Sequence, residues 1–414
     1  MEADIRDIAG MRDRLRNRYS TYDPDNLAHR VGKVAKDLNY MRLLGGVVAA
    51  SIPDVARTVA ANGMMRVFGK TLIPLITKVK ASKPLREEIH RMGIAVDDVI
   101  NGRAQIIADV NDYTKGKTAF ERGTAAAANK FSNINLMNQW TKGIKTVSAI
   151  AMQTRLVETL TSGKIPKEFK RLGISDDDAK NIAELLKKHA TQAEGGNYMV
   201  NRDLWGNPAL ERAWANAMRK EVDRVIVTPG QEKPLFMSDM GWSVVFQFKT
   251  FMMSATNKIL LAGLQGQDAK YIQSVVGMIT LGAMSYAFKE WDAGREVSDD
   301  PMVWVTEGID RSGMLGILME VNNTTEKLSG NNIGIRKLMG VASPASRYAS
   351  RSALDSAVGP TWGLAGDMIK IASAASGESE WKESDTRAVR RLIPAQNLSL
   401  LRQLFDKLEE GIGE

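Results

Sequence analysis

The chain has 414 residues, which is long enough for two to four domains or one extended body with several lobes. Charged residues make up 25% and apolar residues 44%, so a wholly disordered chain is excluded, and the absence of cysteine excludes disulfides, thiolate metal sites and a cysteine nucleophile. The net charge of +8 is compatible with contact with DNA or an anionic membrane surface, but establishes neither.

The first twenty residues are charged and contain no apolar core of the kind that a secretory signal peptide has. Four arginines, Arg12, Arg14, Arg16 and Arg18, alternate with other residues in this stretch. At this spacing they spread around a helix, so the simplest interpretation is a solvated helical surface. The alternative is contact with phosphates without sequence readout, which makes these four residues the candidate DNA contacts.

Signals of helix ends and apolar helical stripes dominate the next part of the chain. Ser175 precedes three aspartates and is the expected N-cap of a helix, for which Gly195 is the expected stop. Asn207 is the expected N-cap of another helix. Its apolar stripe has helical spacing and consists of Leu210, Trp214, Met218, Val222 and Val225.

No sustained alternation of apolar and polar residues predicts a strand, so the expected fold class is all-α. We expect an elongated multi-helix assembly subunit with a central apolar helical hairpin. Loose proline- and glycine-containing stretches divide it into four regions. These are a basic helical region (1–125), a region of capped amphipathic helices (126–230), the apolar hairpin (231–300) and a C-terminal helical region (301–414).

The hairpin consists of two apolar stretches joined by a polar turn. From Tyr271 to Phe288 its second arm has no formal charge, and as a helix it spans about 27 Å, close to the roughly 30 Å of a bilayer core. Gly277 and Gly282 on this arm allow a second helix to approach closely, and Ile279 is one of the apolar residues between them. The arms are bracketed by two candidate interfacial aromatics, Trp242 and Trp291.

Two lysines in the first arm, Lys249 and Lys258, oppose simple membrane insertion. A lysine near the middle of a bilayer costs roughly 2.5–3.5 kcal/mol unless it snorkels, pairs or faces a wet lumen. The sequence therefore leaves two interpretations open. One is the buried centre of a helical domain, and the other is a segment that enters a bilayer conditionally.

No catalytic constellation is found. The segment 63–71 resembles a phosphate-binding loop but has five residues between its glycines where four are needed. The three histidines, His29, His90 and His189, lie far apart, and adjacent carboxylates point about 100° apart on a helix. We therefore expect no enzyme, no cofactor and no metal site.

Three blocks of the sequence resemble a known family. They are FSNINLMNQWTKGIKTVSAIAMQTRLVETL (131–160), VDRVIVTPGQEKPLFMSDMGWSVVFQFKTFMMS (222–254) and RRLIPAQNLSLLRQLFDKL (390–408). In this order they are similar to segments of the large internal virion, or ejection, proteins of tailed bacteriophages. The resemblance covers most of residues 131–408 and is to the C-terminal portion of such proteins. It consists of ordered blocks and not of a catalytic signature.

The resemblance implies a protein that leaves the capsid before the genome and helps to build a conduit across the host cell envelope. The implied location is the virion interior, followed by the host periplasm and inner membrane. The implied partners are copies of the same chain, the portal or other ejection proteins, phage DNA without sequence preference, and the host membrane conditionally. The peptidoglycan-cleaving motif of some relatives is absent, because the GESE segment (377–380) does not supply it.

Two other functions are compatible with the same residues. A structural core scaffold would bind portal and DNA without inserting into a membrane. A co-injected protein that protects phage DNA from host nucleases would show dominant, salt-sensitive DNA binding.

Overall fold

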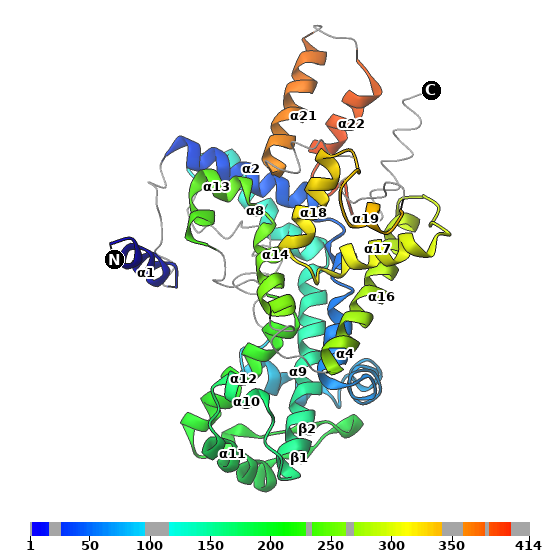
Figure 1. The fold of residues 1–414 in the computed structure, drawn as a ribbon. Helices are drawn as coiled ribbons and strands as arrows, with labels where there is room; N and C mark the ends of the chain where they lie inside the picture. The colour runs from blue at the N-terminus through cyan, green and yellow to red at the C-terminus, as the bar shows by residue number, and fades with distance from the viewer. Residues whose placement is uncertain are drawn as a thin grey trace.

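The computed structural model describes residues 2–15, 26–95, 116–228, 234–261, 269–341, 359–376 and 381–398. In this part of the chain almost all regular structure is helical, so the predicted all-α class is confirmed. Figure 1 shows a long body with α9 along its axis, α10 and α11 at one end, and α21 and α22 projecting at the other.

The N-terminal half contains α1 (Glu2–Leu15), α2 (Leu27–Leu43), α3 (Val47–Ala50), α4 (Asp54–Asn62), the π-helix η1 (Met65–Leu72), α5 (Ile73–Thr77), α6 (Lys83–Arg91), α8 (Ala119–Ile134), α9 (Met137–Thr161), α10 (Glu168–Leu172), α11 (Asp176–His189) and α12 (Pro208–Val225). The C-terminal half contains η5 (Leu235–Ser238), α13 (Met240–Val245), α14 (Lys249–Ala255), the π-helix η6 (Thr256–Leu261), α16 (Ala269–Asp292), α17 (Pro301–Ser312), α18 (Ile317–Leu328), α19 (Ile335–Leu338), α21 (Pro360–Ala375) and α22 (Glu383–Leu392). Short 3₁₀ turns η3 (Glu194–Gly196) and η4 (Arg202–Leu204) complete the set.

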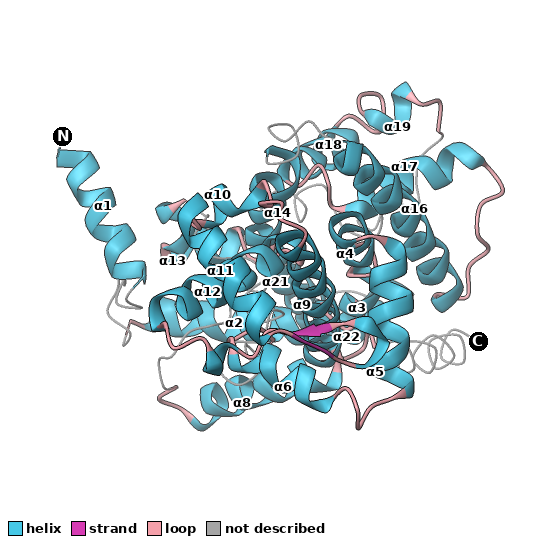
Figure 2. Cartoon of the chain, turned by 90° about the horizontal axis from the view of Figure 1, so that it is seen from below, coloured by secondary structure: helices cyan, strands magenta, loops and turns pink. Residues whose placement is uncertain are grey.

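Helix α9 is the central element, and other helices surround it (Figure 2). Because it is buried over most of its length, even polar side chains on it are enclosed and need partners. Lys145 is 1% exposed, and its ammonium lies 2.8 Å from a carboxylate oxygen of Asp223. Gln153 donates a hydrogen bond to the carbonyl of Tyr198 at 2.8 Å.

The largest hydrophobic core packs α9 against α11 and α12. The ring of Trp214 lies edge-on to Phe169, with centroids 6.4 Å apart. The stripe predicted from the sequence is confirmed, because all five members are buried: Leu210, Trp214, Met218, Val222 and Val225. The predicted caps are confirmed as well, since the side chains of Ser175 and Asn207 accept hydrogen bonds from the first turns of α11 and α12.

The predicted stop of α11 at Gly195 is wrong. The helix ends at His189, because Ala190 is extended and leads into a two-stranded antiparallel sheet. The strands are β1 (Thr191–Gln192) and β2 (Tyr198–Met199). Gly195 instead takes a positive φ of 75° in the turn between them, a conformation that glycine adopts without strain.

Contacts cross the boundaries of the four regions expected from the sequence. Helix α2 packs against α8, α13 and α21. At the base of the projecting α21–α22 pair, the Asp367 carboxylate accepts hydrogen bonds from Arg391 at 2.6 Å and from Arg42 of α2 at 3.3 Å. The expected regions 1–125 and 301–414 are therefore joined by an ion pair between Arg42 and Asp367.

Candidate functional site

Helix α16 is apolar along most of its length, and its inner face packs against α17 and α4. The approach to α17 is close because glycines face each other there. A Cβ added to Gly282 would lie 2.3 Å from the carbonyl oxygen of Gly308, and a Cβ added to Gly308 would lie 2.6 Å from the carbonyl oxygen of Ile279. Gly277 faces α4 with more room, since its added Cβ would lie 3.3 Å from the Cβ of Ala56. The backbones of α16 and α17 therefore touch.

Polar groups on the same inner face are paired. Ser285 is buried and donates a hydrogen bond to the carbonyl of Ala49 at 2.7 Å. The ring of Tyr286 lies edge-on to Trp304 of α17, with centroids 5.9 Å apart. Glu290 accepts a hydrogen bond from Arg295 at 2.9 Å. The inner face of α16 thus combines small and hydrogen-bonded residues with the buried side chains of Met278 and Tyr286.

The outer face of α16 carries large apolar side chains that the described residues cover only in part. Its members recur at helical spacing and are Ile272, Val276, Met284, Phe288 and Trp291, all more than 40% exposed. We call these five residues the α16 outer face. Thr280, which is also exposed, interrupts this row between Val276 and Met284. In a monomeric soluble protein several large exposed apolar side chains on one helix face are typical of a contact with another surface. This face is the candidate functional site.

A buried charge cluster anchors α17 against its neighbours. Arg336 of α19 lies within 2.9 Å of Glu307, 3.1 Å of Asp310 and 2.7 Å of Glu326. All four side chains are at most 5% exposed. Burial alone lowers the pKa of Arg336, but the carboxylates of Asp310 and Glu307 outweigh it and raise that pKa above its usual range. Arg336 therefore stays charged and holds α17, α18 and α19 together.

Both lysines of the predicted hairpin have partners inside the protein. The Lys249 ammonium lies 3.7 Å from a Glu320 carboxylate oxygen, and Lys258 donates a hydrogen bond to the carbonyl of Thr228 at 2.6 Å. A bilayer location for either residue requires these contacts to be exchanged for headgroups, water or another partner.

The sequence predicts one helix for the first arm of the hairpin, but the structure divides this arm into several pieces. Helix α13 ends at Val245, and Phe248, with a positive φ of 71°, directs the chain into α14, after which it continues as the π-helix η6. The two arms share one small hydrophobic cluster, in which Ala255 and Ile259 meet Met278. Helix α16 nevertheless makes its most extensive contacts with α17 and α4.

The structure separates the remaining predicted residues. Trp242 is exposed and packs against Phe236, far along the chain from the exposed Trp291 at the end of α16. Among the candidate DNA contacts, Arg12 lies on α1 and pairs with Asp13 at 2.8 Å. Arg14 is in the last turn of α1, and Arg16 and Arg18 lie outside the described residues.

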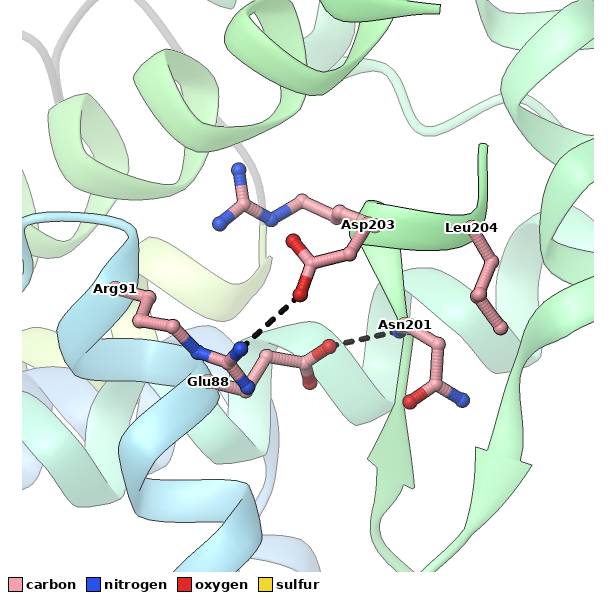
Figure 3. A pocket seen from close by; sticks show the side chains of 6 residues that line it. Glu88, Arg91, Asn201, Asp203 and Leu204 are labelled. Atoms are coloured by element: carbon pink, nitrogen blue, oxygen red, sulfur yellow. Dashed lines mark hydrogen bonds and ion pairs between the residues drawn. The ribbon is translucent and has the colours of Figure 1, made fainter. Parts of the chain in front are cut away.

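A cavity of about 250 Å³ lies between α6 and the segment that follows β2 (Figure 3). Its buried carboxylate, Glu88, accepts hydrogen bonds from the backbone amides of Val200 at 3.2 Å and Asn201 at 2.7 Å. Arg91 at its rim pairs with Asp203 at 3.0 Å. Glu88 therefore ties α6 to the segment that follows β2, which gives it a structural role.

The described residues contain neither a straight membrane span nor a cluster of metal ligands. No single helix there is both long and apolar enough to cross a bilayer, and only the pair Leu27–Leu43 and Val47–Asn62, bent by 82°, meets the length and composition requirements together. No group of three or more histidines and carboxylates in that part of the chain is placed to bind a metal ion. Comparisons with protein-family profiles, with curated proteins and with solved structures found no match for the chain.

Proposed function

We propose that the chain is an internal virion protein of a tailed bacteriophage that leaves the capsid and helps to form a conduit for the genome across the host envelope. The observation that carries the proposal is the α16 outer face, a row of large apolar side chains exposed on a helix. The inner face of this helix packs closely on α17 through glycines. The sequence resemblance of the three blocks supports the same function. Neither catalysis nor a cofactor is part of the proposal.

The free energies involved are compatible with two forms of the same fold, one stored in the virion and one bound to lipid. Full burial of a large apolar side chain stabilises by about 1.5–3 kcal/mol, so covering five half-exposed ones in lipid supplies roughly 5 kcal/mol. Entry of the first arm works against this gain, because Lys249 and Lys258 must leave Glu320 and the Thr228 carbonyl. In the proposed conduit these two lysines face a water-filled lumen or the lipid headgroups.

The test uses the natural lack of cysteine, which allows one fluorophore to be attached at one chosen position. Val276→Cys and Met284→Cys place it on the α16 outer face, and Lys187→Cys on the exposed side of α11 is the matched control. Contact with lipid predicts a blue shift and quenching by lipid-attached quenchers at the first two positions only. No change at Val276 and Met284 with any vesicle composition or pH contradicts the proposal.

Vesicle leakage measures the conduit itself. Lys258→Leu removes a charge that opposes insertion and is expected to keep or increase leakage. Ile279→Lys places a charge at the α16–α17 contact and is expected to abolish leakage, and its thermal unfolding must be measured beside it because a buried charge also destabilises the fold.

A core scaffold remains the second candidate, favoured by the observation that Lys249 and Lys258 both have partners within the fold. It predicts binding to portal and to other virion proteins with no leakage and no lipid contact. A DNA-protecting protein predicts instead that binding to DNA is dominant and salt-sensitive, and that Arg12→Gln with Arg14→Gln weakens it.

A further inference from the structure

A second exposed apolar surface lies on η1 and α5, far along the chain from α16. It consists of Met64, Met65, Ile73, Ile76 and Val79, each at least 50% exposed, and we call it the η1–α5 face. The wide winding of a π-helix brings residues four apart into register here. A Cβ added to Gly69 would lie 2.7 Å from the sulfur of Met65, so the methionine lies along the helix surface.

The opposite side of the same segment is fixed to the core. Val67 is 1% exposed and packs on Val147 of α9. Thr71 donates a hydrogen bond to the side-chain oxygen of Asn197 at 3.0 Å. Pro74 lies against Gly195 in the turn between β1 and β2. The apolar residues of the η1–α5 face therefore point outward because the inner side is occupied, and not because the segment is loose.

Exposed lysines lie at one end of this face, whereas Arg66 and Lys70 pair with Glu158 of α9. Between residues 64 and 86 the chain has six basic residues and no acidic one. Lys78, Lys80 and Lys83 are exposed at its C-terminal end. Lys78 pairs with Glu194 at 2.7 Å and Lys83 with Glu87 at 3.7 Å, but these pairs are exposed and contribute little to stability. The lysines can therefore exchange these partners for other anions.

We infer that the η1–α5 face docks in the plane of an anionic lipid bilayer, with its apolar side chains among the acyl chains and Lys78, Lys80 and Lys83 against the headgroup phosphates. An exposed apolar stripe flanked by lysines is the pattern of a helix that lies in a membrane interface. Two other occupants fit less well. Nucleic acid offers its phosphates to the lysines but nothing to five large apolar side chains. A second copy of the same face would cover the apolar side chains but offers the lysines no carboxylate, because residues 64–86 contain none.

This inference goes beyond the proposed function, since docking through η1 and α5 does not require α16 to enter the bilayer. It assigns a lipid class, an anionic one, and a separate surface. Loss of lipid binding in η1–α5 variants and loss of leakage in α16 variants are therefore distinguishable results.

The test is flotation of the intact chain with vesicles of phosphatidylcholine alone or mixed with phosphatidylglycerol. The inference predicts binding to the anionic vesicles, weakened by salt. Lys78→Gln with Lys80→Gln is expected to reduce the partition coefficient by about 30-fold, from the contribution of each lysine near an anionic surface. The matched control, Lys187→Gln with Lys188→Gln, removes the same charge from α11 and is expected to leave binding unchanged.

The apolar contribution is tested separately. Ile73→Ser with Ile76→Ser keeps every charge, and because both side chains are exposed the fold is expected to survive, which circular dichroism checks. Weaker flotation of this variant supports docking in the interface. The inference is overturned if both pairs of variants bind like the unaltered chain, if binding does not depend on anionic lipid, or if the lysine variant loses only DNA binding.

Discussion

Gly282→Ala probes the closest contact of the candidate site. The added Cβ would lie 2.3 Å from the Gly308 carbonyl oxygen and 3.0 Å from the Ser312 amide nitrogen. Since non-bonded carbon contacts settle near 3.5 Å, α16 and α17 must separate by about 1 Å. Such overpacking costs about 1–3 kcal/mol, and the clash with backbone, which cannot rotate away, places this substitution at the upper end.

The matched control is Gly277→Ala on the same helix. Both substitutions gain about 1 kcal/mol of helix propensity, but at Gly277 the new Cβ meets only the Cβ of Ala56 at 3.3 Å, which a small shift relieves. We therefore expect Gly277→Ala to be neutral or slightly stabilising, and Gly282→Ala to destabilise the α16–α17 pair by about 2 kcal/mol.

Hydrogen exchange followed by mass spectrometry measures the local stability of the α16–α17 pair. A local measurement is needed because a chain of this length does not unfold in one step. A loss of 2 kcal/mol makes the protected amides of α17 exchange about 30-fold faster. Equal protection of α17 in the Gly282→Ala and Gly277→Ala variants would refute the close contact between the two helices.

Three further predictions concern charge. Arg336→Met removes the cation that Glu307, Asp310 and Glu326 share, although Arg311 still pairs with Glu307 at 3.0 Å, and is expected to cost about 3–5 kcal/mol, measured by urea unfolding. A hydrogen bond from Arg30 lowers the pKa of Glu121 to about 2, from 4.5 in the unfolded chain. The contribution of Glu121 to stability is therefore complete above pH 4.5 and is lost as the pH falls toward 2. Glu121→Gln is expected to remove this pH dependence, which hydrogen exchange of the α8 amides measures over an acid titration. Burial lowers the pKa of His90 below 6.5, so folding favours the neutral ring. The contribution of His90 to stability is present above pH 6.5 and is lost as the pH falls through the lowered pKa. An NMR titration of the ring measures this pKa, with His90→Gln as the control.

Helix caps and apolar stripes were predictable from the sequence because their causes are local. Ser175 caps α11 through the amide three residues later, and the stripe from Leu210 to Val225 needs only the helical period to be recognised. The end of α11 was not predictable in this way. Pairing of β1 with β2 stops the helix at His189, and that pairing is a contact between two short segments with no periodic signal.

The hairpin shows a different limit. Gly282 was recognised as a place where a helix can approach, but the partner proved to be α17, the next helix along the chain, and not mainly the preceding arm. A small residue predicts that another helix can approach closely, but it does not predict which helix. The break at Phe248 has no sequence signal at all, since a positive φ is unusual for a large aromatic residue.

The buried charge cluster was missed, although part of it had a signal. Glu307, Asp310 and Arg311 fall at helical spacing on α17, so three charged residues share one helix side. This pattern is typical of a solvated surface as well. Only the fold brings Arg336 of α19 onto the same side and excludes water from it.

Helices α12 and α16 place their large side chains differently. Helix α12 buries those of its apolar stripe, such as Trp214, in the core, whereas α16 buries Met278 and Tyr286 together with glycines and Ser285 and leaves five large apolar side chains exposed, among them Phe288 and Trp291. A helix that only stabilised its own subunit would gain more by turning the large side chains inward. The glycine contact with α17 fixes α16 in the orientation that prevents this. Its outer face is therefore open to a further surface in the proposed function, and fluorophores at Val276 and Met284 test whether that surface is lipid.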